Sequence, residues 1–204
     1  MTVPLADAGE PSEAIRSLRA LVEAAEARSV LVVGVDADAA AVGAPLAAAL
    51  ARSGHPTVLV DADLQRGSES SGPIAAPDDA GGLAAWLTAP GPDEGAVARL
   101  PVRPTDLPGL SLLPAGHALP GAVDVLDGPR LGLLVPALLA RAERVVAVAP
   151  PLARAADALP LARRVDGVVL VVAAGRTTRS DALHARDTLR AAGGRVLGVV
   201  FGGD

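Results

Sequence analysis

Short runs of Val and Leu alternate along the chain with longer segments in which Ala, Leu and Arg recur at helical spacing. This alternation is typical of a parallel sheet covered by helices on both faces. Several of the short runs contain no polar alternation, as expected for strands that are buried on both sides. Strands are predicted at Val30–Val35, Thr57–Asp61, Leu110–Pro114, Arg144–Ala149, Gly167–Ala173 and Arg195–Phe201.

The helical segments complete this pattern. Pro45 falls in the first turn of its predicted helix, where a missing N–H is tolerated, and Gly193-Gly194 is a typical C-cap after the last helix. The predicted fold class is therefore α/β, with a doubly wound, mostly parallel sheet and helices on both faces. Helices are predicted over Glu13–Ala27, Pro45–Arg52, Gly82–Leu87, Arg130–Ala142, Ala153–Arg164 and Ser180–Ala192.

The chain of 204 residues is predicted to form one domain, because this length is enough to bury a substantial core. Residues 1–28 contain the N-terminal helix. Two segments, 66–81 and 89–97, are rich in Gly, Pro, Ser and acidic residues. We expect them to be mobile loops inserted in the domain, rather than linkers between domains.

The residue types that the chain lacks exclude several kinds of functional site. The chain has no Lys, Cys, Tyr or Asn, and all 18 basic residues are Arg. The absence of Lys excludes a phosphate-binding lysine and a Schiff base, and the absence of Cys excludes disulfides and thiolate metal sites. A net charge of −5 disfavours nucleic acid and anionic lipid as partners. Without a visible signal peptide or an apolar run of about 20 residues, we expect a cytoplasmic protein with no direct membrane insertion.

The segment Thr57–Arg66 reads TVLVDADLQR, so that a predicted buried strand ends in two acids, Asp61 and Asp63. It resembles the V-L-L-I-D-A-D-L-R segment of bacterial tyrosine kinases, which are P-loop proteins related to the MinD/ParA ATPases. The resemblance implies a P-loop NTPase-like fold of the MinD/ParA type. It also implies a connection with membrane proteins that set the chain length of capsule and exopolysaccharide. Further partial matches follow in order at Ser12–Leu21, Leu46–Gly54, Leu107–Leu119, Ala149–Pro151, Asp157–Leu159, Val165–Thr178 and Leu189–Val200.

The stretch Gly34–Pro45 stands where the family has its phosphate-binding loop, and it departs from the family pattern. A P-loop uses glycine N–H groups, a Lys and a Ser or Thr that reaches Mg²⁺. This stretch has no Lys, Ser or Thr, and it carries Asp36 and Asp38 where phosphate would lie. One carboxylate about 4 Å from a phosphate charge costs roughly 4 kcal/mol at an effective dielectric near 20, nearly a thousandfold in affinity. The alternative interpretation, as loop or helix-capping residues, leaves both acids opposed to phosphate.

Other positions of the family's nucleotide site also differ. By the resemblance, Val148 stands in place of a second metal-handling acid and Gly202 in place of a base-contacting Asn, and no tyrosine cluster precedes Asp204. The sequence therefore predicts a degenerate member with no catalytic residue, no metal site and no tightly bound cofactor, neither ATP nor Mg²⁺. Asp61 and Asp63 are predicted to be vestigial nucleotide and magnesium positions. Alternatively, they form a structural turn in which Asp63 bonds local backbone N–H groups.

Glu13, Arg16 and Arg19 match an E-x-x-R-x-x-R motif with which the family packs subunits into a ring. Their spacing of three places them along one stripe of a helix. Arg side chains suit bidentate pairing with carboxylates across an interface, and we predict an oligomer interface here. The alternative is a solvated charged face with no partner. The apolar side of the same helix is predicted to consist of Ile15, Leu18, Val22 and Ala25.

The predicted function is that of a non-catalytic, kinase-like pseudo-ATPase, acting as a scaffold or regulatory partner in bacterial polysaccharide chain-length control or export. The predicted partners are other copies of this chain, an active kinase, or the cytoplasmic end of a polysaccharide chain-length or export membrane protein. Two alternatives remain open. One is a divergent ATPase or kinase that grips phosphate with Arg66, Arg154 or Arg176 in place of Lys. The other is a positioning module like MinD or ParA.

Overall fold

The computed structural model describes residues 11–68, 81–90, 99–119, 121–154, 156 and 158–202. The two predicted mobile loops, 66–81 and 89–97, therefore lie largely outside the described residues, as does the beginning of the predicted N-terminal segment.

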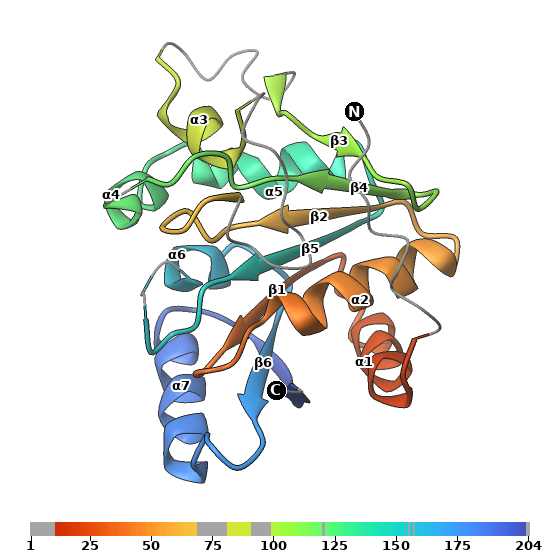
Figure 1. Ribbon diagram of the computed structural model, residues 1–204, viewed down its shortest axis with the longest axis vertical. Coiled ribbons are helices and arrows are strands. Elements are labelled where there is room, and N and C mark those ends of the chain that lie inside the picture. Colours follow the sequence, from red (N-terminus) through yellow and green to blue (C-terminus); the bar gives the residue numbers. More distant parts are fainter. Residues whose placement is uncertain are drawn as a thin grey trace.

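A seven-stranded sheet runs through the molecule in the order β3-β4-β2-β5-β1-β6-β7 (Figure 1). Every neighbouring pair is parallel except β3 and β4. The predicted class, a doubly wound and mostly parallel α/β sheet, is confirmed. The strands are β1 (Ser29–Gly34), β2 (Thr57–Asp61), β3 (Arg103–Pro104), β4 (Leu110–Leu113), β5 (Arg144–Ala149), β6 (Gly167–Ala173) and β7 (Val196–Gly202).

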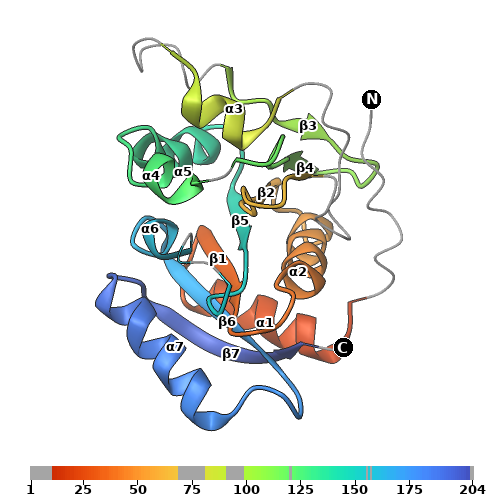
Figure 2. The same ribbon diagram turned by 60° about the vertical axis from the view of Figure 1, so that its left-hand side comes forward.

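Helices cover both faces of this sheet (Figure 2). One face packs against α1 (Glu13–Ala24) and α2 (Ala40–Arg52). The other face packs against α3 (Leu83–Thr88), α4 (Ala122–Leu126), α5 (Leu131–Leu139), α6 (Ala158–Ala162) and α7 (Arg179–Ala191). In β1, the side chains of Val30 and Val32 belong to the apolar cluster on the face covered by α1 and α2. Those of Leu31 and Val33 belong to the cluster on the opposite face. Burial on both sides explains why these strands show no polar alternation.

The start of α2 differs from the prediction. The helix begins at Ala40 rather than at Pro45, so Pro45 lies inside it and not in its first turn. The Oδ1 atom of Asp38 accepts the N–H of Ala40 at 2.9 Å, which provides one of the free N–H groups at the helix start with an acceptor. The proline inside the helix is tolerated because α2 is buried along most of its length against β2 and β5.

The segment after β5 is also less helical than predicted, since helix α6 covers only Ala158–Ala162. The backbone N–H groups of Leu152 and Ala153 donate to the carbonyls of Gly34 and Val35, at 2.9 and 3.0 Å. These bonds tie the segment to the end of β1, which keeps it out of a helix. The first helix ends at Ala24, and Glu26 takes a positive φ of 55°. Elements β3 and α4 were not predicted, because they are too short for a periodic pattern.

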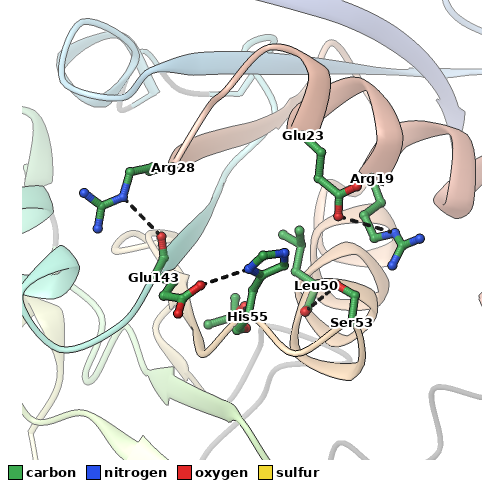
Figure 3. Close-up of polar contacts among 8 residues, drawn as sticks. Arg19, Glu23, Arg28, Leu50, Ser53, His55 and Glu143 are labelled. Carbon is green, nitrogen blue, oxygen red and sulfur yellow. Dashed lines mark hydrogen bonds and ion pairs between the residues drawn. The ribbon is translucent and has the colours of Figure 1, made fainter.

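Polar contacts brace the edge of the sheet at which the parallel strands begin (Figure 3). His55 Nδ1 lies 2.9 Å from Glu143 Oε2, and Arg28 Nε donates to the Glu143 carbonyl at 3.5 Å. The hydrogen bond with His55 holds the pKa of Glu143 below its ordinary value. Asp166 Oδ2 accepts the backbone N–H groups of Arg28 and Ser29, at 2.9 and 2.8 Å, and so joins the starts of β1 and β6.

Candidate functional site

The parallel strands β1, β2 and β5 end at the opposite edge of the sheet, where doubly wound proteins bind ligands. Strand β1 lies between β5 and β6. Strands β2 to β5 lie on one side of β1, and β6 and β7 lie on the other, so the direction of the topology switches at β1. The candidate site is therefore formed by the loops that follow β1, β2 and β5.

The loop after β1 folds back tightly on itself. A Cβ atom on Gly34 would lie far inside 3.0 Å of the Ala37 carbonyl oxygen, a separation that real Cβ atoms do not show. Asp38 places a carboxylate oxygen at the first turn of α2, where free N–H groups and the helix dipole favour an anion. Asp36 Oδ1 accepts a hydrogen bond from the Thr177 hydroxyl. Both acids thus bond within the chain, as loop and capping residues do.

The loop after β2 contains the two acids of the DAD sequence. Asp61 is buried, with an exposed fraction of 1%, and its Oδ1 accepts the N–H of Asp63 at 3.0 Å. Asp63 Oδ1 accepts the N–H of Arg66 at 3.3 Å, and its Oδ2 accepts a hydrogen bond from Arg154 Nη2 in an ion pair. The backbone bonds are those of the structural turn that the sequence offered as an alternative. The pairing with Arg154 has no signal in the sequence.

Val148 of β5 is paired with Asp61 of the neighbouring strand β2. Its exposed fraction is 5%, and its Cγ2 would lie well inside 3.0 Å of a Cβ placed on Gly43. Helix α2 therefore approaches β5 closely at this point. The position that the resemblance assigns to a metal-handling acid is an apolar packing contact.

The predicted interface residues lie on α1, which packs against α2 and β7. Three of the four residues predicted for its apolar side, Ile15, Leu18 and Val22, are buried, whereas Ala25 is the C-cap and is half-buried. Arg16 pairs with Glu13 at 2.6 Å, and Arg19 pairs with Glu23 at 3.7 Å. The side chains of Glu13 and Arg16 are 81% and 51% exposed. The charged stripe therefore faces away from the sheet and is occupied by ion pairs within its own helix.

Within the described ranges, no group of three or more His, Asp or Glu side chains is placed to hold a metal ion. No helix in the same part of the chain combines the length and the apolar character of a membrane span.

The architecture is that of the P-loop NTPase fold, and the likeness to solved structures supports this. The kinase domain of the Escherichia coli tyrosine kinase ETK matches with a TM-score of 0.83, 23% identity, 99% coverage of this chain and 80% of that domain. The cell division ATPase MinD of Pyrococcus furiosus matches with a TM-score of 0.59, 20% identity, 85% coverage of this chain and 71% of that protein. At these identities the likeness shows the fold alone.

Closer relatives narrow the assignment from fold to family. The tyrosine-protein kinase CpsD of Streptococcus agalactiae is 30% identical over 156 residues, which cover 76% of this chain and 66% of that kinase. The BceF tyrosine kinase domain is 29% identical, with a TM-score of 0.77 and coverage of 99% of this chain and 83% of that domain. No family model matches the chain. The homologues of this chain are bacterial tyrosine-protein kinases, and the chain spans just under two thirds of the length of CpsD.

Proposed function

We propose that the protein is a kinase-like pseudo-ATPase that acts by binding, as a scaffold or regulatory partner in bacterial polysaccharide chain-length control or export. The observation that carries this proposal is the Asp38 carboxylate, which accepts the N–H of Ala40 where a phosphate would bind at the start of α2. A nucleotide phosphate would either lie beside this charge or displace it. The chain has no lysine that could offset the repulsion.

The ion pair between Asp63 and Arg154 supports the same proposal. A carboxylate that is already paired with a guanidinium is a weak ligand for Mg²⁺, which usually binds through one or two acids together with substrate phosphates. The pair joins the loops after β2 and β5 directly. In this proposal it takes over, without any ligand, the bridging that Mg²⁺ and nucleotide would provide.

The competing proposal is an ATPase that binds phosphate through Arg in place of Lys. The contacts of Arg154 and Arg176 disfavour it. Arg154 would have to leave Asp63, whose side chain is only 15% exposed. Arg176 donates to the carbonyl of Asp36 at 3.4 Å and is thus directed toward a loop that carries two acids. A positioning module like MinD or ParA has the likeness of fold in its favour, but the net charge of −5 opposes DNA binding.

The polysaccharide context comes from the kinase family and is part of the proposal. We infer that the protein works in the cytoplasm, at the inner face of the membrane, through a partner. That partner would be an active kinase subunit or the cytoplasmic end of a polysaccharide chain-length or export protein.

Isothermal titration of the protein with Mg-ATP is expected to show no saturable binding up to about 1 mM. The expected cause is the repulsion by Asp38, roughly 4 kcal/mol at 4 Å and an effective dielectric near 20. Asp38→Asn keeps an acceptor for the Ala40 N–H and removes the charge, so it should raise nucleotide affinity, by up to about a thousandfold. Asp127→Asn is the matched control, since Asp127 pairs with Arg163 on the surface. Micromolar binding by the wild type would defeat the proposal.

Light scattering is expected to give a multimeric mass that does not change when Mg-ATP is added. Exposed ion pairs within a helix are worth at most about 1 kcal/mol, so Arg16 and Arg19 are free to exchange them for carboxylates of a neighbouring subunit. Arg16→Ala/Arg19→Ala should therefore reduce the mass toward that of a monomer. Arg186→Ala/Arg190→Ala, which removes two arginines from α7 instead, is the matched control. If the wild type is monomeric, or if both variants keep its mass, α1 is not the interface.

A further inference from the structure

A cavity of about 430 Å³ opens on the face of the sheet that α6 and α7 cover. Its floor is apolar and is contributed by Val35 at the end of β1, Leu159 of α6 and Ala185 of α7. None of the lining residues comes from α2 or from the loop after β2. The cavity therefore lies on the other side of the sheet from the start of α2, and it shares only the loops after β1 and β5 with the candidate nucleotide site.

The rim of this cavity carries acidic groups. Asp36, in the loop after β1, and Asp181, on α7, both line the cavity, together with His184 of α7. Each carboxylate has one oxygen held within the chain, Asp36 Oδ1 by the Thr177 hydroxyl and Asp181 Oδ2 by the Thr178 hydroxyl. The hydrogen bond from Thr178 lowers the pKa of Asp181, so this group stays charged at neutral pH. The remaining oxygens can accept hydrogen bonds from a cation at the mouth of the cavity.

The exposure of the lining decides what size of ligand fits. Asp36, Ala153, Ala156, Asp181 and His184 are all exposed, so the cavity is an open groove between α7 and the loop after β5. Sites for small molecules bury most of the ligand surface, about 70–90% of it, and an open groove does not. A longer ligand that inserts one side chain and gains its other contacts outside the groove fits this shape. An Arg or Lys side chain combines an aliphatic stem with a cationic head, as this lining requires.

We propose that this groove binds a peptide segment of a partner protein in which an Arg or Lys is flanked by aliphatic residues. The stem of the basic side chain lies on Val35, Leu159 and Ala185. Its cationic head lies between Asp36 and Asp181 and forms charge-assisted hydrogen bonds with their free oxygens. Because none of its lining residues comes from α2 or from the loop after β2, the groove can bind a partner without a bound nucleotide.

The test is an NMR titration of the ¹⁵N-labelled full chain with a blocked nine-residue peptide that has a central arginine, a leucine on each side and alanines elsewhere. We expect saturable shifts in α7 and in the loops after β1 and β5, with a dissociation constant below about 1 mM. Ala156→Trp fills the groove and should abolish the shifts. Ala140→Trp, at the exposed end of α5, is the matched control and should leave them unchanged.

The charges are tested separately. Asp36→Asn/Asp181→Asn keeps the acceptors for Thr177 and Thr178, and should weaken binding about tenfold by removing two charge-assisted hydrogen bonds. The same peptide with a central glutamate should give no saturable shifts. The proposal is overturned if the arginine peptide causes no shifts at 1 mM, if it binds Ala156→Trp as tightly as the wild type, or if the glutamate peptide binds equally well. Equal affinity for free butylguanidinium would assign the groove to small cations instead.

Discussion

Gly34→Ala is expected to lower the free energy of unfolding by at least about 3 kcal/mol, because overpacking against rigid backbone is difficult to relieve. The added Cβ would overlap with the carbonyl oxygen of Ala37, and neither atom is the end of a flexible side chain. Relief requires the loop after β1 to open, with loss of the bond from the Leu152 N–H to the Gly34 carbonyl. Urea unfolding followed by the fluorescence of the single, buried Trp86 measures the change.

Gly54→Ala is the control, because it distinguishes the effect of the close approach at Gly34 from the general cost of replacing a glycine. Gly54 follows α2 with a φ of +91°, and nothing lies within 4 Å of a Cβ built on it. Its replacement costs only the left-handed backbone strain, about 1–2 kcal/mol. If Gly34→Ala is no more destabilising than Gly54→Ala, the tight fold of the loop after β1 is wrong.

The second large effect is expected at the contact between α2 and β5. Gly43→Ala should destabilise the protein by about 2 kcal/mol, although alanine is the better helix former by about 1 kcal/mol, because the new Cβ meets Val148 Cγ2. Val148→Ala alone should cost about 1–3 kcal/mol through the cavity it leaves. In the Val148→Ala background the clash is gone, so Gly43→Ala should be neutral or stabilising. A double-mutant cycle of urea unfolding is expected to show a coupling energy of at least about 1 kcal/mol.

Val146 supplies the control for this cycle. It lies two residues earlier in β5, belongs to the same apolar cluster as Val148 and is fully buried, but it is not among the nearest neighbours of Gly43. Val146→Ala and Gly43→Ala should therefore add to within about 0.5 kcal/mol. If Gly43→Ala and Val148→Ala were additive to the same degree, Val148 would not be the residue that limits the approach of α2.

Most strands were predictable because burial on both faces leaves an unbroken apolar run. The limits of β2, β5 and β6 are those predicted from such runs. The predicted helix limits were wrong where particular hydrogen bonds, one local and two long-range, decide which backbone groups are free. Helix α2 starts at Ala40, where the Asp38 carboxylate accepts the Ala40 N–H. The residues directly after β5 are not helical because Leu152 and Ala153 bond to the end of β1. None of these bonds leaves a periodic pattern in the sequence.

The candidate site divides in the same way. Composition and order of residues alone established the absence of lysine, the two acids in the loop after β1 and the pair of Asp61 and Asp63 at the end of a strand. The sequence also named Arg154, but only as a possible phosphate ligand. Its pairing with Asp63, 91 residues away, depends on how the loops after β2 and β5 meet.

The sequence by itself thus determined the strands, the family resemblance and the absence of lysine, because these follow from local residue types and their spacing. Only the tertiary structure decided where the remaining charges act. It places the Asp38 carboxylate on the first turn of α2, a guanidinium on Asp63, and both Asp36 and Asp181 in the lining of one groove, although 145 positions separate those two residues along the chain. Parallel strands deliver their carboxyl ends to one edge whatever their order in the chain, so the contacts there depend on topology rather than on sequence neighbours.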